Sequence, residues 1–364
     1  MKTVGIDARL YFQTGVGVYL RNLIYYLQKI RLNDLRFNIY ILKSDSDNIH
    51  FENKNFIKRE VTSRWHSLSE QISFKKDLDK DNLDLMHFTY FSYPVLYDKK
   101  FIATIHDLTP LLFKTGKAST QNPFVYELKY LVFKYILYNQ VKKALHIITP
   151  TKTVKKQILE VYGVQLKSKV TSLYEGVDSA LIEKEGNAAL ADKFKRPFFI
   201  YVGTFYPHKN VKNLIKAFSN IKESIRLVLV GPQDYFASEI LALIRQLHQE
   251  DRIVLFTPST REDVIFFYKN ASALIHPSLS EGFGLPIMEA AYYNLPIIAS
   301  DIEVFKEILD SQYIFFNPND VNDITQKIHK FLSEKPQFDY KKLVARYSFQ
   351  KMAEETLKIY KNSL

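Results

Sequence analysis

The 364-residue chain contains no cysteine, so it forms no disulfide bond, offers no thiolate ligand to a metal and has no cysteine nucleophile. No stretch approaches the roughly 18 uninterrupted apolar residues that a membrane-spanning helix needs, so we expect none. The first ten residues place Asp7 and Arg9 where a signal peptide would require apolar side chains. These absences are those expected of a cytoplasmic protein.

Recognition signatures for nucleic acid are also missing, although the formal net charge is +11. We find no zinc finger, no RNA-binding signature and no arginine-rich block, so we expect no nucleic-acid partner. The excess charge lies in the first half: residues 1–180 hold 27 Lys and Arg against 17 Asp and Glu, whereas residues 181–364 hold 23 against 22. A basic half could attract an anionic membrane surface or a phosphorylated acceptor, and part of the excess could be ordinary solvated lysine.

The residues that are present, 46% hydrophobic and 24% charged, are typical of a folded globular protein. A length of 364 residues exceeds what one hydrophobic core usually supports, so we expect two domains. Short apolar runs alternate with helical patterns along the chain, which predicts an α/β protein with two doubly wound parallel sheets.

The most informative stretch covers residues 273–300 and reads ALIHPSLSEGFGLPIMEAAYYNLPIIAS. Its pattern predicts a strand, a glycine loop, a helix that begins at Pro286, and a second strand. Glycines let a backbone approach a ligand closely, and the N–H groups of a helix start favour anions such as phosphate. Glu281 and Glu289 flank this start and can accept hydrogen bonds from hydroxyl groups. The stretch therefore predicts a nucleotide sugar as ligand, unless both acids only complement the helix dipole.

A second candidate loop, GTFYPHKN at residues 203–210, follows a predicted strand over 197–202 and precedes a predicted helix over 211–220. Negative charge that develops on a leaving diphosphate needs a nearby cation, and Lys209 is the candidate. The alternative is a solvated lysine at a helix start, where a cation opposes the helix dipole.

Two further candidates lie in the first half. Gly15 and Gly17 stand between a strand over 2–7 and a helix over 19–30, where they form either a ligand-binding loop or a tight turn. His106 follows an apolar strand at its carboxyl end, where open α/β sheets bind ligands. The alternative is that His106 caps local backbone groups.

The predicted helix over residues 124–143 is rich in Tyr, Phe and Lys and has apolar residues on more than one face. It is either a helix on a membrane surface, with lysines reaching outward, or a buried interdomain helix with charged ends. Its charge comes from Lys129, Lys134, Lys142 and Lys143.

Together these motifs resemble the retaining glycosyltransferases of family 4, whose fold is GT-B. EGFGLPIMEA is similar to the glutamate-x7-glutamate motif of that family, GVGVY to its first loop, TIHDL to its TxHDL motif and GTFYPHKN to its phosphate-binding loop. The resemblance implies two Rossmann-like domains that face a cleft: an acceptor-side domain over 1–178, a linker over 179–196 and a nucleotide-sugar domain over 197–346. A final helix, about 347–364, would cross back onto the first domain.

The resemblance also implies roles for individual residues. Glu281 would accept hydrogen bonds from hydroxyls of the transferred sugar, and Glu289 from those of the ribose. Lys209 would stabilise the leaving diphosphate, and His106 would hold the sugar from the first domain. The catalytic residues are thus His106, Lys209 and Glu281. The donor-binding residues are Gly15, Gly17, Gly203, Thr204, His208, Lys209, Thr257, Glu281, Gly282, Phe283, Gly284, Leu285 and Glu289.

Two positions depart from the family pattern. Glu175 stands where the family's NGVD segment has asparagine, and no arginine accompanies Lys209, whose neighbour is His208. Arg9, Arg21 or a helix N-terminus are the candidates for the missing second positive group at the diphosphate. No DxD-type motif occurs in a fitting place, so we expect no metal, and no cofactor apart from the nucleotide diphosphate sugar as co-substrate.

The pattern GIDAR, GVGVY and TIHDLTPLLF resembles bacterial mannosyltransferases of surface polysaccharide assembly. It implies a hexosyltransferase that moves mannose from GDP-mannose to a glycan or a polyprenyl-diphosphate-linked acceptor, with a peripheral contact to the anionic inner membrane face left open. UDP-linked glucose, galactose or N-acetylhexosamine is the rival donor. Outside this class, the alternatives are a sugar-nucleotide epimerase and a non-catalytic partner subunit of the same fold.

Overall fold

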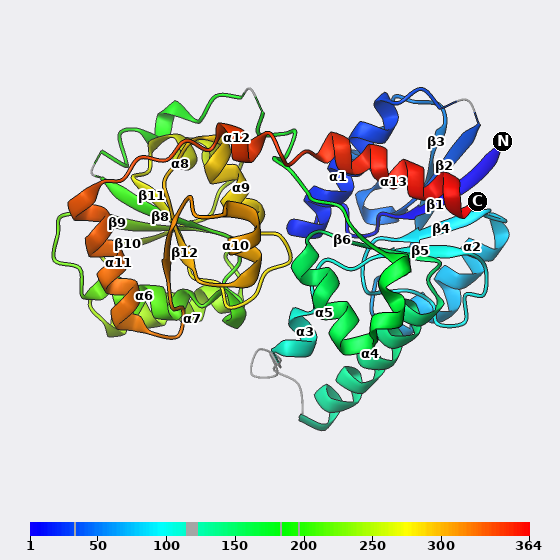
Figure 1. The fold of residues 1–364 in the computed structure, drawn as a ribbon, viewed down its shortest axis with the longest axis horizontal. Coiled ribbons are helices and arrows are strands. Elements are labelled where there is room, and N and C mark those ends of the chain that lie inside the picture. Colours follow the sequence, from blue (N-terminus) through cyan, green and yellow to red (C-terminus); the bar gives the residue numbers. More distant parts are fainter. Residues whose placement is uncertain (33, 114–122, 183, 196) are drawn as a thin grey trace. The chain divides into compact units, whose positions relative to one another are not determined.

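The computed structural model describes residues 1–364 except 33, 114–122, 183 and 196. The chain divides into two compact units, Met1–Glu175 with Ser348–Leu364, and Gly176–Tyr347 (Figure 1). Each unit is built on one parallel sheet covered by helices, which confirms the predicted α/β fold. No helix in the described ranges is both long enough and apolar enough to cross a membrane.

The first unit contains a seven-stranded sheet in the order β3-β2-β1-β4-β5-β6-β7, with every pair parallel. Its strands are β1 (Lys2–Asp7), β2 (Leu35–Leu42), β3 (Phe56–Val61), β4 (Leu85–Phe88), β5 (Phe101–Thr104), β6 (His146–Thr149) and β7 (Val170–Ser172). Its α-helices are α1 (Gly15–Lys29), α2 (Lys75–Lys80), α3 (Thr109–Leu112), α4 (Pro123–Lys143), α5 (Lys152–Tyr162) and α13 (Phe349–Ser363). The central strands are buried on both faces, as expected of a parallel sheet between helices.

β3 is the strand that sequence reasoning does not find. Its sequence FIKREV has three charged residues in six positions and lacks the apolar run of the other strands. β3 lies at the edge of the sheet and pairs with β2. An edge strand is less enclosed than a central one and tolerates charge, so its pattern is weak.

The second unit contains a six-stranded sheet in the order β10-β9-β8-β11-β12-β13, again parallel throughout. Its strands are β8 (Phe198–Val202), β9 (Arg226–Val230), β10 (Ile253–Phe256), β11 (Ala273–His276), β12 (Ile297–Ser300) and β13 (Ile314–Phe316). Its α-helices are α6 (Val211–Ser219), α7 (Tyr235–Gln246), α8 (Arg261–Asn270), α9 (Leu285–Tyr292), α10 (Glu303–Leu309), α11 (Val321–Glu334) and α12 (Lys341–Val344).

Both sheets have one point at which the order of strands reverses. It lies between β1 and β4 in the first sheet and between β8 and β11 in the second. In open α/β sheets, ligands bind outside the carboxyl ends of the strands at such a switch point. The loops that follow β8 and β11 therefore meet where a ligand of the second unit is expected.

The C-terminal helix α13 belongs to the first unit and packs against α1, as predicted (Figure 1). A buried chain of hydrogen bonds holds it in place. The Tyr360 hydroxyl lies 2.7 Å from His87 Nδ1, and His87 Nε2 lies 2.8 Å from Thr104 Oγ1. Thr104 Oγ1 in turn lies 3.0 Å from the Tyr19 hydroxyl on α1. Burial lowers the pKa of His87 to about 3, so the ring is neutral at pH 7.

Candidate active site

Lys209 and Glu281 meet at the switch point of the second sheet. β8 leads into Gly203 and a short 3₁₀ turn, Pro207–Lys209, while β11 leads into the loop that carries Glu281. Lys209 Nζ donates a hydrogen bond to Glu281 Oε1 at 2.7 Å. The two residues are 72 positions apart in sequence, and the parallel pairing of β8 with β11 brings their loops together.

Backbone hydrogen bonds tie these two loops to one another. The N–H of Leu279 donates to the carbonyl of His208 at 2.8 Å, and the side-chain amide of Asn210 donates to the carbonyl of Pro277 at 3.1 Å. Asn210 precedes α6 with a φ of 58°, a left-handed conformation that asparagine tolerates better than most residues. The backbone on both sides of Lys209 is thus fixed before any ligand binds.

One oxygen of Glu281 accepts three hydrogen bonds. Besides Lys209, His276 Nε2 at 2.9 Å and Ser278 Oγ at 2.7 Å both contact Oε1. Burial by itself would raise the pKa of Glu281, but the charge of Lys209 and the hydrogen bonds from His276 and Lys209 outweigh it and hold the pKa well below its usual range. No residue in the described part of the chain donates to Oε2, which leaves that oxygen for a ligand.

Glu289 lies in the second turn of α9 and is buried. The hydroxyl of Tyr268, from α8, donates to Glu289 Oε2 at 2.7 Å, and the Tyr268 ring stacks on Tyr293 with 5.8 Å between centroids. Burial raises the pKa of Glu289 to about 6, and the hydrogen bond from Tyr268 opposes this shift. Since α9 has no acid in its first turn, the helix-dipole alternative does not account for Glu289.

The glycine loop between Glu281 and α9 has little freedom. Gly284 adopts a φ of 90°, and a Cβ there would lie 2.9 Å from the Phe305 ring, so another residue would be strained. Phe283 is buried with its ring edge-on to Tyr347, 5.9 Å between centroids, and so offers a ligand only its backbone. The other two residues predicted from this loop are the partly exposed Gly282 and Leu285, the first residue of α9.

The remaining donor-binding candidates of the second unit follow the carboxyl ends of two strands. Gly203 and Thr204 directly follow β8, and Thr257 is exposed directly after β10. The ring of His208 stacks on Tyr206, with 5.9 Å between centroids. Their contacts with a donor stay predictions.

In the first unit, the structure corrects the place of the glycine pair. α1 begins at Gly15, so Gly15 and Gly17 lie in its first turn and not in a loop before it. A Cβ on Gly17 would lie 2.6 Å from the carbonyl oxygen of Tyr11, whereas one on Gly15 would meet no atom of the described residues within 4 Å. Gly17 therefore lets the start of α1 pack closely on the preceding loop, and Gly15 leaves open space beside it.

His106 lies between a backbone carbonyl and a carboxylate, and it is buried. Its Nε2 is 3.0 Å from the carbonyl oxygen of Thr89, and its Nδ1 is 3.4 Å from Glu175 Oε1. A carbonyl only accepts, so Nε2 carries a hydrogen and donates it to Thr89. This hydrogen bond agrees with the alternative interpretation, in which His106 caps a local backbone group. A contact between His106 and a sugar stays a prediction.

Sequence reasoning misses three side chains that contact the predicted ones. His276 and Ser278 stand shortly before Glu281 in the sequence, and polar residues at the carboxyl end of a buried strand are a signal that could have revealed them. Tyr268 comes from the last turn of α8, and only tertiary packing brings it to Glu289.

Arg9, considered as the second cation, is engaged elsewhere. It is 2% exposed and donates to Asp7 Oδ2 at 2.6 Å and to Glu70 Oε1 at 2.7 Å. Its guanidinium also lies over the ring of Phe74, 3.8 Å from the centroid. Two carboxylates compensate its charge, so Arg9 is not free to bind a diphosphate. Arg21 donates to the carbonyl of Tyr11 and remains a candidate.

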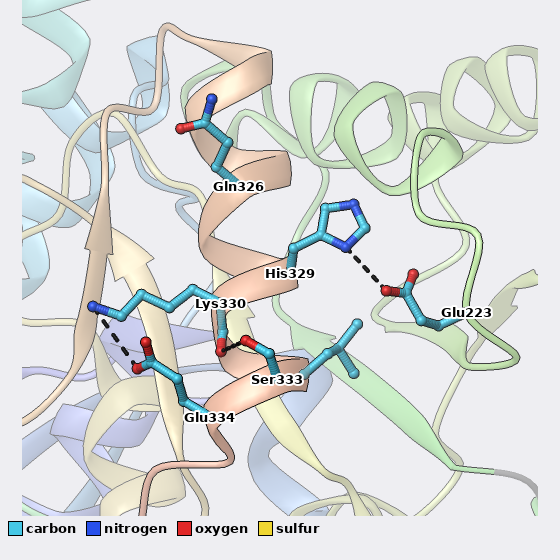
Figure 2. Close-up of a pocket in the computed structure, with 7 residues that line it drawn as sticks. Glu223, Gln326, His329, Lys330, Ser333 and Glu334 are labelled. Atoms are coloured by element: carbon cyan, nitrogen blue, oxygen red, sulfur yellow. Dashed lines mark hydrogen bonds and ion pairs between the residues drawn. The ribbon is translucent and has the colours of Figure 1, made fainter.

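A cavity of about 540 Å³ in the second unit lies away from these loops (Figure 2). Its lining residues are Glu223, Gln326, His329, Lys330, Leu332, Ser333 and Glu334. Glu223 precedes the amino end of β9, whereas the predicted residues follow carboxyl ends. The cavity contains none of the predicted site residues. In the described ranges, no three His, Asp or Glu side chains are grouped so that they could hold a metal ion.

Two units, each built on one parallel sheet with candidate ligand loops at its switch point, fit the GT-B class of glycosyltransferases. The chain belongs to glycosyltransferase family 4: the family "Glycosyltransferase Family 4" matches residues 14–181 and "Glycosyl transferases group 1" matches residues 183–348. The protein is therefore a glycosyltransferase.

Its relatives include mannosyltransferases. The chain is 31% identical over 262 residues to the O-antigen chain mannosyltransferase RfbU of Salmonella typhimurium. The aligned region covers 70% of this chain and 71% of RfbU. It is 30% identical over 161 residues to the serotype-specific mannosyltransferase WbdA of Escherichia coli, 43% of this chain and 20% of WbdA. Among solved structures, sucrose-phosphate synthase from Thermosynechococcus elongatus has the same fold, with a TM-score of 0.78 at 16% identity over 100% of this chain and 99% of the synthase.

Proposed function

We propose that this glycosyltransferase transfers mannose from GDP-mannose, with retention of configuration, to a hydroxyl of a glycan or of a polyprenyl-diphosphate-linked oligosaccharide. The reaction would serve cell-surface polysaccharide synthesis at the inner face of the membrane. The similarity to RfbU and WbdA, both mannosyltransferases, supports the choice of mannose. The observation that carries the proposed donor site is the Lys209–Glu281 pair at the switch point between β8 and β11.

This pair has the donors and acceptors that a hexosyl diphosphate needs. An ammonium group has three N–H donors, and Glu281 takes one from Lys209, so two remain for diphosphate oxygens. Glu281 stays ionised because its pKa is held well below the usual range, and Oε2 accepts from sugar hydroxyls. Because the two groups are adjacent, the phosphate and the hydroxyls of one hexosyl phosphate bind side by side.

Glu289 has a suitable environment for the ribose. Tyr268 occupies Oε2, so Oε1 accepts hydrogen bonds from ribose hydroxyls. With a pKa of about 6, the carboxyl is mainly ionised at pH 7 and becomes protonated in mildly acidic solution. The occupancy of this subsite should therefore depend on pH in a range where most carboxylates do not titrate.

Retention without a protein nucleophile requires attack from the face on which the leaving group departs. The acceptor hydroxyl forms its bond to the anomeric carbon as the bond to the diphosphate breaks, and its proton passes to the departing diphosphate oxygen. Lys209 stabilises the negative charge that develops on that oxygen. The contribution of His106 rests on the family resemblance.

A thermal-shift screen over GDP-, UDP- and TDP-linked sugars tests the donor. A ligand that binds only the folded state raises the melting temperature, and we expect GDP-mannose to raise it most. The Lys209→Met variant should lose this shift, whereas Lys330→Met, at the separate cavity, should keep it. A larger shift with a UDP-sugar would replace GDP-mannose as donor, and no shift with any donor would contradict the proposed site.

A further inference from the structure

The helix α4 has apolar side chains on two sides, and the first unit covers only one of them. Toward the sheet, α4 buries Ile136, Leu137 and Val141. On the other side, five large side chains are about half or more exposed: Leu128 64%, Leu131 59%, Val132 49%, Tyr135 60% and Tyr138 50%. Their spacings of three and four residues place them on one face of the helix. These five residues, here named the outer stripe, extend along about 15 Å of α4.

Exposed lysines border the outer stripe. Lys129, Lys134, Lys142 and Lys143 are all exposed. The ammonium of Lys134 lies 5.7 Å from the centroid of the Tyr130 ring, and that of Lys142 lies 5.6 Å from the centroid of the Tyr138 ring. Side chains of this kind lay their methylene stems along apolar surface while the charge stays in a polar layer.

The end of α5 extends this surface. The rings of Tyr138 and Tyr162 lie 6.4 Å apart, and Lys142 donates to the carbonyl of Tyr162 at 3.2 Å. Val161 and Val164, beside Tyr162 in the chain, are 52% and 76% exposed. Residues 127–170 contain nine lysines against two glutamates, so this part of the chain carries much of the net positive charge of the first half.

We propose that the outer stripe and its bordering lysines dock on the surface of an anionic lipid bilayer. Leucine, valine and tyrosine side chains enter the boundary between head groups and acyl chains, and the lysines pair with anionic head groups. Figure 1 shows the N-terminal half of α4 running away from the sheet of the first unit. The exposed fractions of the five side chains leave the stripe accessible. A second copy of the chain is a poorer occupant, because two stripes face to face would bring lysine borders of like charge together.

Sedimentation of the full chain with lipid vesicles tests the docking. The protein should bind vesicles that contain phosphatidylglycerol, bind phosphatidylcholine vesicles much less, and dissociate in high salt. Leu131→Asp should lower the partition coefficient at least about tenfold, because it places a charge on the apolar face. The matched control Leu68→Asp changes a leucine that is 84% exposed elsewhere in the first unit, and it should bind as the parent does.

The lysines are tested separately. Changing Lys129, Lys134 and Lys142 together to Gln should lower the partition coefficient by roughly a hundredfold, since each lysine contributes about fivefold near an anionic surface. A control set of Lys54, Lys76 and Lys80 changed to Gln removes the same charge from the first unit away from α4, and should have a much smaller effect.

Three results would overturn the proposal. The first is equal vesicle binding by the parent and Leu131→Asp, and the second is no binding by the parent. The third is a dimer, detected by light scattering, that Leu131→Asp dissociates while vesicles bind neither protein. The thermal shift with GDP-mannose should be the same in the parent and Leu131→Asp. This control distinguishes a failed docking surface from an unfolded variant or a wrong donor.

Discussion

At the scale of single residues, the surroundings of Glu281 and Glu289 set their charges in opposite directions. Both carboxylates are largely buried, and burial favours the neutral form of each. Lys209 overcomes this effect for Glu281, whose pKa is held well below the usual range. Glu289 accepts a hydrogen bond from the neutral hydroxyl of Tyr268, but burial outweighs this bond and the charge of Arg261, so its pKa rises to about 6. The two acids of one motif therefore respond differently to pH.

The affinity for GDP should fall as the solution is acidified from pH 7 to pH 5. The folded carboxyl of Glu289 has a pKa of about 6 instead of its usual 4.5, so in this range it loses the charge that we propose accepts ribose hydroxyls. In the protein without ligand, folding stability depends on pH with the opposite sign. The raised pKa of Glu289 contributes to the free energy of unfolding below pH 4.5, and this contribution is lost as the pH rises through about 6. Calorimetric titration of GDP at several pH values measures the effect, which we expect to be several-fold.

Two variants distinguish Glu289 from other titrating groups. Glu289→Gln should bind GDP more weakly at pH 7 and lose the pH dependence. Tyr268→Phe removes a hydrogen bond that favours the carboxylate, so the pKa of Glu289 should rise and the midpoint should move to higher pH. An unchanged midpoint in Tyr268→Phe would show that another group titrates.

At the scale of secondary-structure elements, the chain places its strands and helices largely where the apolar patterns predict them. The stretch over 273–300 folds as the predicted strand, glycine loop, helix and strand, with Gly284 at the start of α9. The exceptions have local causes. β3 is a charged edge strand, and α1 begins at Gly15 because its first turn packs on the loop before it.

The link between α13 and the first sheet should contribute measurably to stability. Tyr360→Phe would leave His87 Nδ1 buried without its partner, which costs about 1–3 kcal/mol. We expect a melting temperature lower by a few degrees. Tyr25→Phe is the matched control, because Tyr25 is 41% exposed. Equal melting temperatures for the two variants would show that the hydrogen bond to His87 contributes nothing.

At the scale of the whole molecule, sequence and topology together explain why the candidate residues converge. The sequence predicts that the loops around Lys209 and Glu281 follow parallel strands. That β8 and β11 are neighbours follows only from the strand order, which the structure supplies. The same holds for Tyr268 and Glu175, whose contacts with Glu289 and His106 arise only from packing. Motifs thus predict the candidate loops that meet at the switch point, and the tertiary structure supplies the partners that set the charge and orientation of their side chains.

The most direct test of this account is a pair of calorimetric titrations, with GDP-mannose and with GDP, on the parent and on Glu281→Gln. Glutamine keeps the size of the side chain and an oxygen that accepts from Lys209, but removes the charge that we propose binds sugar hydroxyls. We predict a loss of about tenfold or more for GDP-mannose, as expected for hydrogen bonds to a charged group, and at most a small change for GDP. Glu223→Gln, at the separate cavity, should match the parent. Equal losses for both ligands, or no loss for GDP-mannose, would contradict the assignment of Glu281 to the transferred sugar.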